Sequence, residues 1–339
     1  MPALASTPQV ICLGECLLDR IFHRYDTSQS GIPFWDDYPG GAPANVAFGL
    51  AKLGTSTGFL GCLGSDEAGQ RLLSELTAGQ VNCDQVQIAS GAPTRVVLVQ
   101  RDEHGERHFV GFSQPSVDGY ADTLLRLEPH HSAWFQTASV LVMGTLGLAY
   151  PLTQRSMAQA LQWAHAHNVQ TIVDINWRPA FWPEPQQAPE IIRNFLDGVH
   201  IVKFSQEEAH WLFHTTNPRK IFEQLSQPSL VMVTAGAAGC QYATSTLDGE
   251  IAAFQVDCED TTGAGDAFLA ALIHRLCQDG FDSLSYADQL QHVIRYASAA
   301  GALTTLRAGA MVAQPQAEEV RAFLYLQPSA PSANPAPEF

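Results

Sequence analysis

Basic residues are scarce in this sequence. Only 18 Lys and Arg stand against 34 Asp and Glu among 339 residues, which gives a formal net charge of −16 at pH 7. The basic residues form no cluster along the chain, and proteins that hold a nucleic-acid backbone need one. We therefore expect no nucleic acid as a partner. A polyanionic ligand would need backbone amides, a metal ion or a few well-placed cations instead.

Long apolar runs are also missing. No segment approaches the roughly 18 consecutive apolar residues of a membrane span. Residues 1–9 lack the basic flank and the apolar core of a secretory signal. The seven cysteines form no C-x-x-C pair, and a chain of this size needs no disulfide framework. We expect a cytoplasmic protein with reduced thiols and no membrane partner.

Several common functional motifs do not occur. The sequence has no G-x-x-x-x-G-K-[ST] phosphate loop and no G-x-G-x-x-G after an apolar strand. His210 and His214 are spaced like two metal ligands on a helix, but they lack the Glu of a zincin motif and a third ligand nearby. We interpret them as ordinary surface or core histidines.

What the sequence does contain is a regular alternation of short apolar strands and helical segments. The predicted strands are 10–13, 57–63, 140–143, 171–175, 199–203 and 230–234. The predicted helices are 43–53, 151–168, 206–213, 267–276, 286–305 and 316–324. One more predicted helix is capped by residues 64–67 and ends at residue 77. This alternation predicts an α/β fold with a mostly parallel sheet covered on both faces, with ligands at the carboxyl ends of its strands.

A second, smaller sheet is predicted beside the first. Segments 95–100 and 107–112 flank a turn that contains His104 and Gly105, which is typical of a hairpin. The polar segment 22–39 can pair with it. We therefore expect one domain over residues 1–326, with a lid formed by about 15–40 and 90–115. Residues 327–339 are rich in Pro, Ala and Ser and are predicted to be a flexible tail.

The segment Gly263-Ala264-Gly265-Asp266 stands at the start of a predicted helix, after an apolar strand-like run that ends near Val256. Uncovered amides and the helix dipole suit a phosphate or a developing negative charge there. The Asp266 carboxylate is placed to take a proton from a hydroxyl. Taken alone, the segment is explained equally by a helix cap after a tight turn.

Two further segments have polar groups at helix or strand ends. Gly40 and Gly41 precede a predicted helix whose first turn contains Asn45, and an amide suits sugar hydroxyls because it donates and accepts. Taken alone, this segment is also an ordinary loop-to-helix junction. Residues 174–178 end a predicted strand with Asp174, Asn176 and Arg178 at the expected ligand edge.

Taken together, these segments resemble those of the PfkB/ribokinase-like carbohydrate kinases. Residues 40–53 match the family's N-terminal signature, and residues 260–269 match its C-terminal one. Similar family segments occur at 174–179, 203–208 and 234–239, and residues 301–310 resemble the fructokinase-like branch. The resemblance implies a ribokinase-like three-layer αβα domain with a mostly parallel sheet and a small β-sheet lid.

The resemblance also implies a set of site residues for a sugar, ATP and Mg²⁺. Asp266 is implied as the general base, with the Gly263, Ala264 and Gly265 amides as an anion hole. The other implied contacts are Asp19, Gly40, Gly41, Asn45 and Arg178 for the sugar, Lys203, Thr234, Gly236, Gly239 and Ser298 for the nucleotide, Glu208 for Mg²⁺ through water, and Asp260 and Thr262 for a monovalent cation such as K⁺.

Departures from the family pattern bear on the substrate. Ser205 stands where many members have Asn, although fructokinase-like members also carry Ser there. Leu17 replaces a ribose-binding Asn of ribokinases, and no acid follows Met143. We therefore expect an ATP-dependent kinase that converts fructose to fructose 6-phosphate.

Alternatives to this expectation stay open. Within enzymes, the substrate could be 2-keto-3-deoxygluconate, another sugar or a nucleoside. The chain could also be a catalytically silent regulatory protein that binds sugar or nucleotide, although the base and the anion-hole glycines are intact. Pairing of lid edges between subunits makes a homodimer a further expectation.

Overall fold

The computed structural model describes residues 7–23, 34–101 and 107–327. Within them, an eight-stranded sheet has the order β14-β13-β12-β11-β10-β9-β1-β4. The strands from β12 to β4 run parallel, whereas β13 and β14 join antiparallel at one edge. The strands are β1 (Val10–Leu13), β4 (Thr57–Leu60), β9 (Val140–Met143), β10 (Gln170–Asp174), β11 (Ile201–Ser205), β12 (Leu230–Thr234), β13 (Cys240–Ala243) and β14 (Asp248–Ile251).

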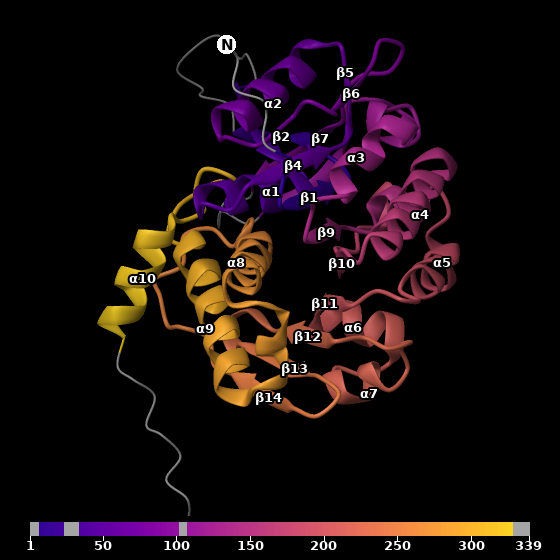
Figure 1. The fold of residues 1–339 in the computed structure, drawn as a ribbon. Helices are drawn as coiled ribbons and strands as arrows, with labels where there is room; N and C mark the ends of the chain where they lie inside the picture. Colours follow the sequence, from indigo (N-terminus) through magenta and orange to yellow (C-terminus); the bar gives the residue numbers. More distant parts are fainter. Residues whose placement is uncertain (1–6, 24–33, 102–106, 328–339) are drawn as a thin grey trace, which may run out of the picture.

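Helices cover both faces of this sheet (Figure 1). The helices are α1 (Ala42–Lys52), α2 (Glu67–Ala78), α3 (Ser132–Phe135), α4 (Pro151–Ala166), α5 (Ala188–Phe195), α6 (Gln206–Phe213), α7 (Pro218–Phe222), α8 (Ala264–Asp279), α9 (Ala287–Thr304) and α10 (Ala317–Leu326). The core residues of α1, α8 and α9 share one apolar cluster, and those of α4, α5 and α6 share another. The sheet therefore separates two cores.

The strand sequences explain this layering. In β1 all residues are apolar and buried, and successive side chains point to opposite faces of the sheet. Val10 and Cys12 enter the core of α1, α8 and α9, whereas Ile11 and Leu13 enter the core of α4, α5 and α6. A strand buried on both faces reads as a continuous apolar run, which is the pattern that predicted the sheet.

The smaller sheet has the order β3-β2-β7-β8. Its strands are β2 (Leu17–His23), β3 (Phe34–Gly40), β7 (Val96–Arg101) and β8 (Arg107–Phe112), and β2 and β7 run parallel between two antiparallel neighbours. The large parallel sheet and this smaller sheet confirm the predicted fold class. The predicted turn at His104 and Gly105 and the predicted tail from 328 onward lie outside the described residues.

Three details of the sequence-based prediction were wrong or incomplete. The predicted strand 57–63 breaks at Gly61 into β4 and β5 (Cys62–Gly64), and β5 pairs with β6 (Gln87–Ala89). A Cβ atom at Gly61 would lie 2.5 Å from the Phe59 ring, so the chain passes close to that ring. The run before Val256 is not a strand, because the chain leaves the sheet after β14. The hairpin β13–β14 and the helices α5 and α7 were not predicted.

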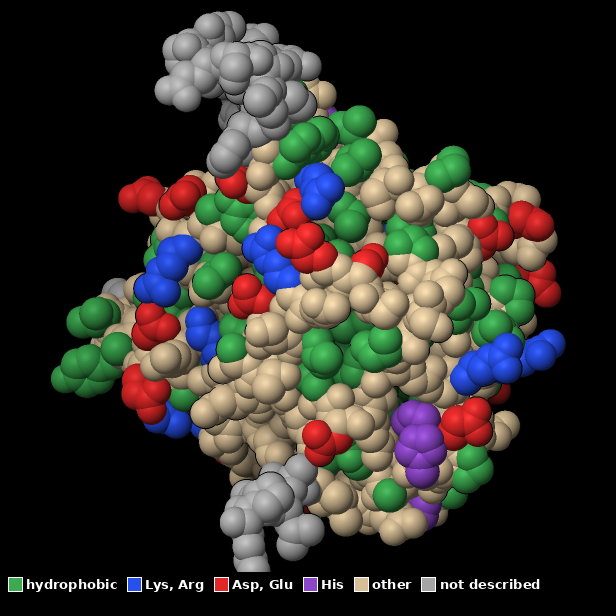
Figure 2. Space-filling view, turned by 90° about the horizontal axis from the view of Figure 1, so that it is seen from above, with side chains coloured by type: hydrophobic (Ala, Val, Ile, Leu, Met, Phe, Trp, Pro, Cys, Tyr) green, Lys and Arg blue, Asp and Glu red, His purple; other side chains and the backbone are tan. Residues whose placement is uncertain are grey.

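The surface agrees with the acidic composition. On the face shown in Figure 2, Lys and Arg side chains stand among acidic ones and form no continuous basic area. None of the helices in the described ranges is long and apolar enough to cross a membrane.

Candidate active site

The first turns of α1 and α8 meet at the carboxyl edge of the large sheet. There Nδ2 of Asn45 donates a hydrogen bond of 2.7 Å to Oδ2 of Asp266. Asp266 is half-buried, and burial raises the pKa of its carboxyl group to about 6, against the opposing effect of the Asn45 amide. The structure thus brings together the predicted base and a predicted sugar contact from opposite ends of the chain.

Both glycine-rich turns need glycine for steric reasons. Gly263 has a φ of +80°, and a Cβ atom there would lie 2.7 Å from Cα of Ala310. Gly41 has a φ of +98°, and a Cβ atom there would lie 2.6 Å from the carbonyl oxygen of Glu15. Other residues would be strained in both conformations and would also clash with backbone atoms.

The start of α8 leaves amides available for an anion. Gly263 occupies the N-cap position, so no side chain caps the helix. The Ala264 amide donates to the carbonyl of Thr261 (3.2 Å), whereas the amides of Gly263, Gly265 and Asp266 have no hydrogen-bond partner among the described residues. Of the amides predicted at 263–265 to form an anion hole, those of Gly263 and Gly265 are available, and the Asp266 amide beside them is available too.

A buried cation lies directly behind this turn. Nζ of Lys203 donates to Oδ2 of Asp174 at 2.8 Å, and both side chains are buried. A Cβ atom at Gly265 would lie 3.4 Å from Nζ, so the ammonium group is close to the helix start. Burial lowers the pKa of Lys203, but the charges of Asp174 and Glu208 outweigh it and leave this pKa above its ordinary value. Lys203 therefore stays protonated beside the predicted anion hole.

A cavity of about 390 Å³ extends from this turn toward β12 and α9. Four of the residues predicted to contact a nucleotide line it, namely Thr234, Gly236, Gly239 and Ser298. The loop 253–256, which sequence analysis took for a strand, forms another wall with Phe254 and Val256. Ala264 and Gly265 close the end nearest Asp266. Lys203, also predicted as a nucleotide contact, is not among the lining residues.

The remaining predicted sugar contacts lie around the smaller sheet and the β10 end. Asp19 is half-buried on β2, and a Cβ atom at Gly40 would lie 2.8 Å from its Oδ2 atom. Arg178 is exposed after β10, and its guanidinium donates to the carbonyl of Trp177 (2.8 Å). Its charge is close enough to Asp266 to lower the pKa of that carboxyl group.

The predicted cation ligands are held by backbone amides. Oε2 and Oε1 of Glu208 accept from the amides of Ser205 (2.8 Å) and Trp177 (2.7 Å), so Glu208 also closes a capping box at the start of α6. Oδ1 of Asp260 accepts from the amide and the hydroxyl of Thr262, at 3.0 and 2.7 Å. Both carboxylates thus fix local backbone, and their roles toward cations stay predictions.

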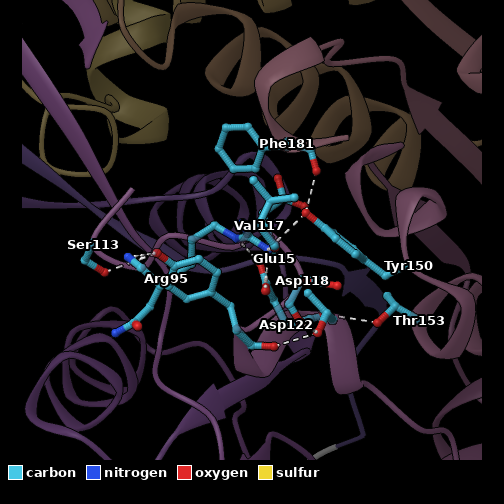
Figure 3. Close-up of polar contacts among 12 residues, drawn as sticks. Glu15, Arg95, Ser113, Val117, Asp118, Asp122, Tyr150, Thr153 and Phe181 are labelled. Carbon is cyan, nitrogen blue, oxygen red and sulfur yellow. Dashed lines mark hydrogen bonds and ion pairs between the residues drawn. The ribbon is translucent and has the colours of Figure 1, made fainter. Parts of the chain in front are cut away.

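A polar cluster around Arg95 was not predicted from the sequence. Arg95 is buried just before β7 and forms a two-pronged ion pair with Asp122, at 2.6 and 2.9 Å (Figure 3). Nη2 of Arg95 also donates to the hydroxyl of Tyr150 (3.1 Å). Glu15 lies beside this cluster and is 5% exposed. Its position two residues after the end of β1, at the predicted ligand edge, could have marked it as a site candidate, although nothing in the sequence indicates its contact with α1.

Comparison with known proteins gives one consistent result. Residues 7–317 match the model of the family described as pfkB family carbohydrate kinase. A relative from Arabidopsis thaliana named probable fructokinase-6, chloroplastic, is 34% identical over 320 residues, which cover 93% of this chain and 82% of the relative.

Solved structures agree with this relationship. The crystal structure of fructokinase with bound ATP from Xylella fastidiosa is 28% identical, with a TM-score of 0.84 over 93% of this chain and 98% of that one. A double mutant of the fructokinase from Vibrio cholerae O395, in a fructose, ADP and potassium ion bound form, is 28% identical with a TM-score of 0.79 over 94% and 99% of the two chains. The chain described here belongs to the pfkB family of carbohydrate kinases.

Proposed function

We propose that this enzyme transfers the γ-phosphate of ATP to fructose and yields fructose 6-phosphate. One observation carries the proposal. Asp266 lies between Asn45 on the sugar side and the uncovered amides of α8 at the end of the 390 Å³ cavity. A base at that junction can take the proton from an acceptor hydroxyl while a phosphoryl group arrives from the cavity. The Vibrio cholerae structure, which contains fructose and ADP, supports the same pair of ligands.

The cavity suits a nucleotide. Its volume falls within the range of small-molecule sites, about 300–1,000 Å³. Phe254, Val256 and Phe268 supply apolar walls for a base, and Gly236 and Gly239 let backbone approach the ligand closely. The phosphates would point toward Gly265. The ATP bound in the Xylella fastidiosa structure supports this assignment.

The chemistry follows from charge and position. At pH 7 Asp266 is mostly ionised, and Asn45 holds its Oδ2 atom while Oδ1 makes no hydrogen bond with a described residue. Oδ1 can therefore accept the proton of the sugar hydroxyl. The amides at the start of α8 and the Lys203 ammonium would stabilise the negative charge on the transferring phosphoryl group. A chain of net charge −16 thereby binds a polyanion without a basic cluster.

The cation assignments rest on the chemistry of the ligand groups. Carboxylate and hydroxyl oxygens suit hard cations, and Mg²⁺ usually keeps several waters and binds the substrate's phosphates. We assign Glu208 to Mg²⁺ through water, and Asp260 with Thr262 to a monovalent cation, K⁺ first. Bound Mg²⁺ would neutralise phosphate charge. The potassium ion in the Vibrio cholerae fructokinase supports the second assignment.

We assign residues 1–326 to a single domain. Its smaller sheet, within about 15–40 and 90–115, is assigned as a lid. It carries Asp19 on β2, and closing it over the sugar would exclude water from the phosphoryl group. Its exposed aromatic and apolar side chains, Trp35, Phe109 and Val110, support pairing of two such sheets in a homodimer.

A coupled assay of ADP release tests the proposed function. The substrates would be fructose, ribose, 2-keto-3-deoxygluconate and a set of nucleosides, each with and without K⁺. We expect fructose to give the highest kcat/KM and K⁺ to increase it. A higher value for an acidic sugar or a nucleoside would assign the enzyme to that substrate instead. Tight sugar binding without any ADP release would identify a silent binding protein.

The pKa of Asp266 predicts the acid side of the pH profile. Because the carboxylate must be ionised to act as a base, kcat should fall about tenfold per pH unit below pH 6 and level off above it. The Asn45 hydrogen bond lowers this pKa, so Asn45→Leu should move the break to higher pH. Initial rates from pH 5 to 8 at saturating ATP and fructose measure both. An unchanged break in the variant would contradict the assignment to Asp266.

A further inference from the structure

Glu15 caps helix α1 from a different segment of the chain. The N-cap residue of α1 is Gly41, which has no side chain, and the first turn of α1 contains no acidic residue. Oε1 of Glu15, from the connection between β1 and β2, accepts a hydrogen bond of 3.2 Å from the Ala42 amide. One turn further on, Asn45 holds Asp266. Glu15 therefore helps to fix the helix that orients the catalytic base.

The second carboxyl oxygen of Glu15, Oε2, takes no part in capping α1. Oε2 makes no hydrogen bond with another residue in the described part of the chain, and the amide of Glu15 itself also acts on this carboxyl group. A Cβ atom at Gly144 would lie 4.0 Å from Oε2 and 3.7 Å from Cγ of Pro43. Gly144 directly follows β9, at the edge of the sheet where ligands bind. Gly144 thus places no side chain against Oε2, on the loop that follows β9.

The charges around Glu15 favour its neutral form. The acidic groups near it in the described part of the chain are the carboxylates of Asp122 and Asp266, the Tyr150 hydroxyl and the Cys16 thiol. The nearby Arg95 guanidinium is already paired with Asp122 (Figure 3). Burial raises the pKa of Glu15 to about 8, against the opposing hydrogen bonds from the amides of Glu15 itself and Ala42, and the charges of Asp122 and Asp266 act in the same direction as burial. At pH 7 the group carries a proton. Since Oε1 accepts from the Ala42 amide, we assign that proton to Oε2.

We propose that Glu15 is a further residue of the sugar site, which anchors α1 through Oε1 and donates from Oε2 to a hydroxyl of the bound sugar. The inference rests on the proposed sugar kinase function and deepens it. It adds a neutral donor to the charged and amide groups already assigned to the sugar. The neutral Glu15 then donates a hydrogen bond to one hydroxyl of the substrate, and the ionised Asp266 accepts from another.

Two substitutions at Glu15 separate this role from a structural one. Glu15→Gln keeps an acceptor for Ala42 and a donor for the sugar, so the KM for fructose should stay within about threefold of the wild-type value. Glu15→Leu removes both, and that KM should rise by about 10- to 100-fold. The KM for ATP should not change in either variant. Circular dichroism and thermal unfolding establish that each variant is folded.

The pH dependence gives a readout that packing alone would not change. In the wild-type enzyme the KM for fructose should rise above pH 8, as Glu15 loses its proton and gains a charge beside Asp266. In Glu15→Gln this rise should disappear. An alkaline rise that persists in Glu15→Gln, or a Gln variant as impaired as the Leu variant, would overturn the inference. If Glu15→Leu does not fold, the profile of Glu15→Gln still decides.

Deoxyfructose analogues identify the hydroxyl. Calorimetry would compare two proteins that both carry Asp266→Asn, one with Glu15 and one with Glu15→Leu. With Glu15 present, one analogue should bind more weakly than fructose. With Glu15→Leu, the same analogue and fructose should bind equally well. If every analogue loses the same affinity relative to fructose in the protein with Glu15 and in the protein with Glu15→Leu, then Oε2 contacts no hydroxyl. Failure of the wild-type enzyme to release ADP with fructose would contradict the proposed function itself, before any Glu15 variant is measured.

Discussion

Replacing Asp266 with Asn should lower kcat by about 10²- to 10⁴-fold, while the KM values for fructose and ATP stay within about threefold of wild type. Asn keeps the size of the side chain and a carbonyl oxygen that accepts from Asn45, so the junction of α1 and α8 should persist. It removes the group that takes the proton. Steady-state ADP release measures the loss, and calorimetry measures fructose binding.

A matched control lies at the other end of the same helix. Asp279 ends α8 and forms an ion pair with Arg275, far along the helix from the site. Asp279→Asn makes the same chemical change and should leave kcat unchanged. If Asp266→Asn keeps kcat within tenfold of wild type, another group must take the proton.

The second large effect is expected from Lys203→Met. Lys203 and Asp174 form a buried ion pair at 2.8 Å, and removing one partner of such a pair leaves an uncompensated charge in the interior. We expect a loss of about 3–5 kcal/mol in the free energy of unfolding. The variant should also lose kcat, since the ammonium group behind Gly265 is gone. Urea unfolding and ADP release measure the two effects.

A double variant separates stability from catalysis. Lys203→Met with Asp174→Asn removes both charges and should recover most of the lost stability, because no buried charge is left unpaired. It should not recover kcat. As a control, Arg307→Met removes the cation of an exposed pair with Glu319 and should change stability by at most about 1 kcal/mol. Full recovery of kcat in the double variant would show that Lys203 contributes nothing to catalysis.

The pair of Lys203 and Asp174 also shows where sequence reasoning reached its limit. Both residues were singled out, one as a nucleotide contact and one at a strand end. Their partnership depends on the register of β10 and β11, in which Asp174 and Lys203 are directly paired. Apolar runs predict that two strands exist, but not which residues of the two strands face each other.

The elements themselves were largely predictable. The predicted segments 140–143, 206–213 and 230–234 coincide with β9, α6 and β12, and α1 lies within one residue of its predicted position. These segments are continuous apolar runs or amphipathic helices with clear ends, such as the Ser205 cap of α6. The hairpin β13–β14 was missed because β14 is short, polar and at most half-buried, so no apolar pattern marks it.

Glu15 was missed for a different reason. Its partner Ala42 lies across two strands of the smaller sheet, and no local pattern connects a carboxyl group after β1 with the start of α1. Only the three-dimensional structure shows that the Glu15 carboxyl group accepts from the first amide of α1, whose N-cap residue is a glycine.

The contact between α1 and α8 has a consequence for the protein during its synthesis. Asn45 and Asp266 are 221 residues apart in the sequence, so a ribosome completes the sugar-binding segment long before it reaches the base. At roughly 5–20 residues per second, the interval lasts on the order of tens of seconds. Throughout it the nascent chain can release no phosphorylated sugar, and the face of α1 that later packs on α8 lacks its cover. A premature stop before residue 266 would leave a fragment that consumes no ATP and exposes an apolar helix face to chaperones and proteases.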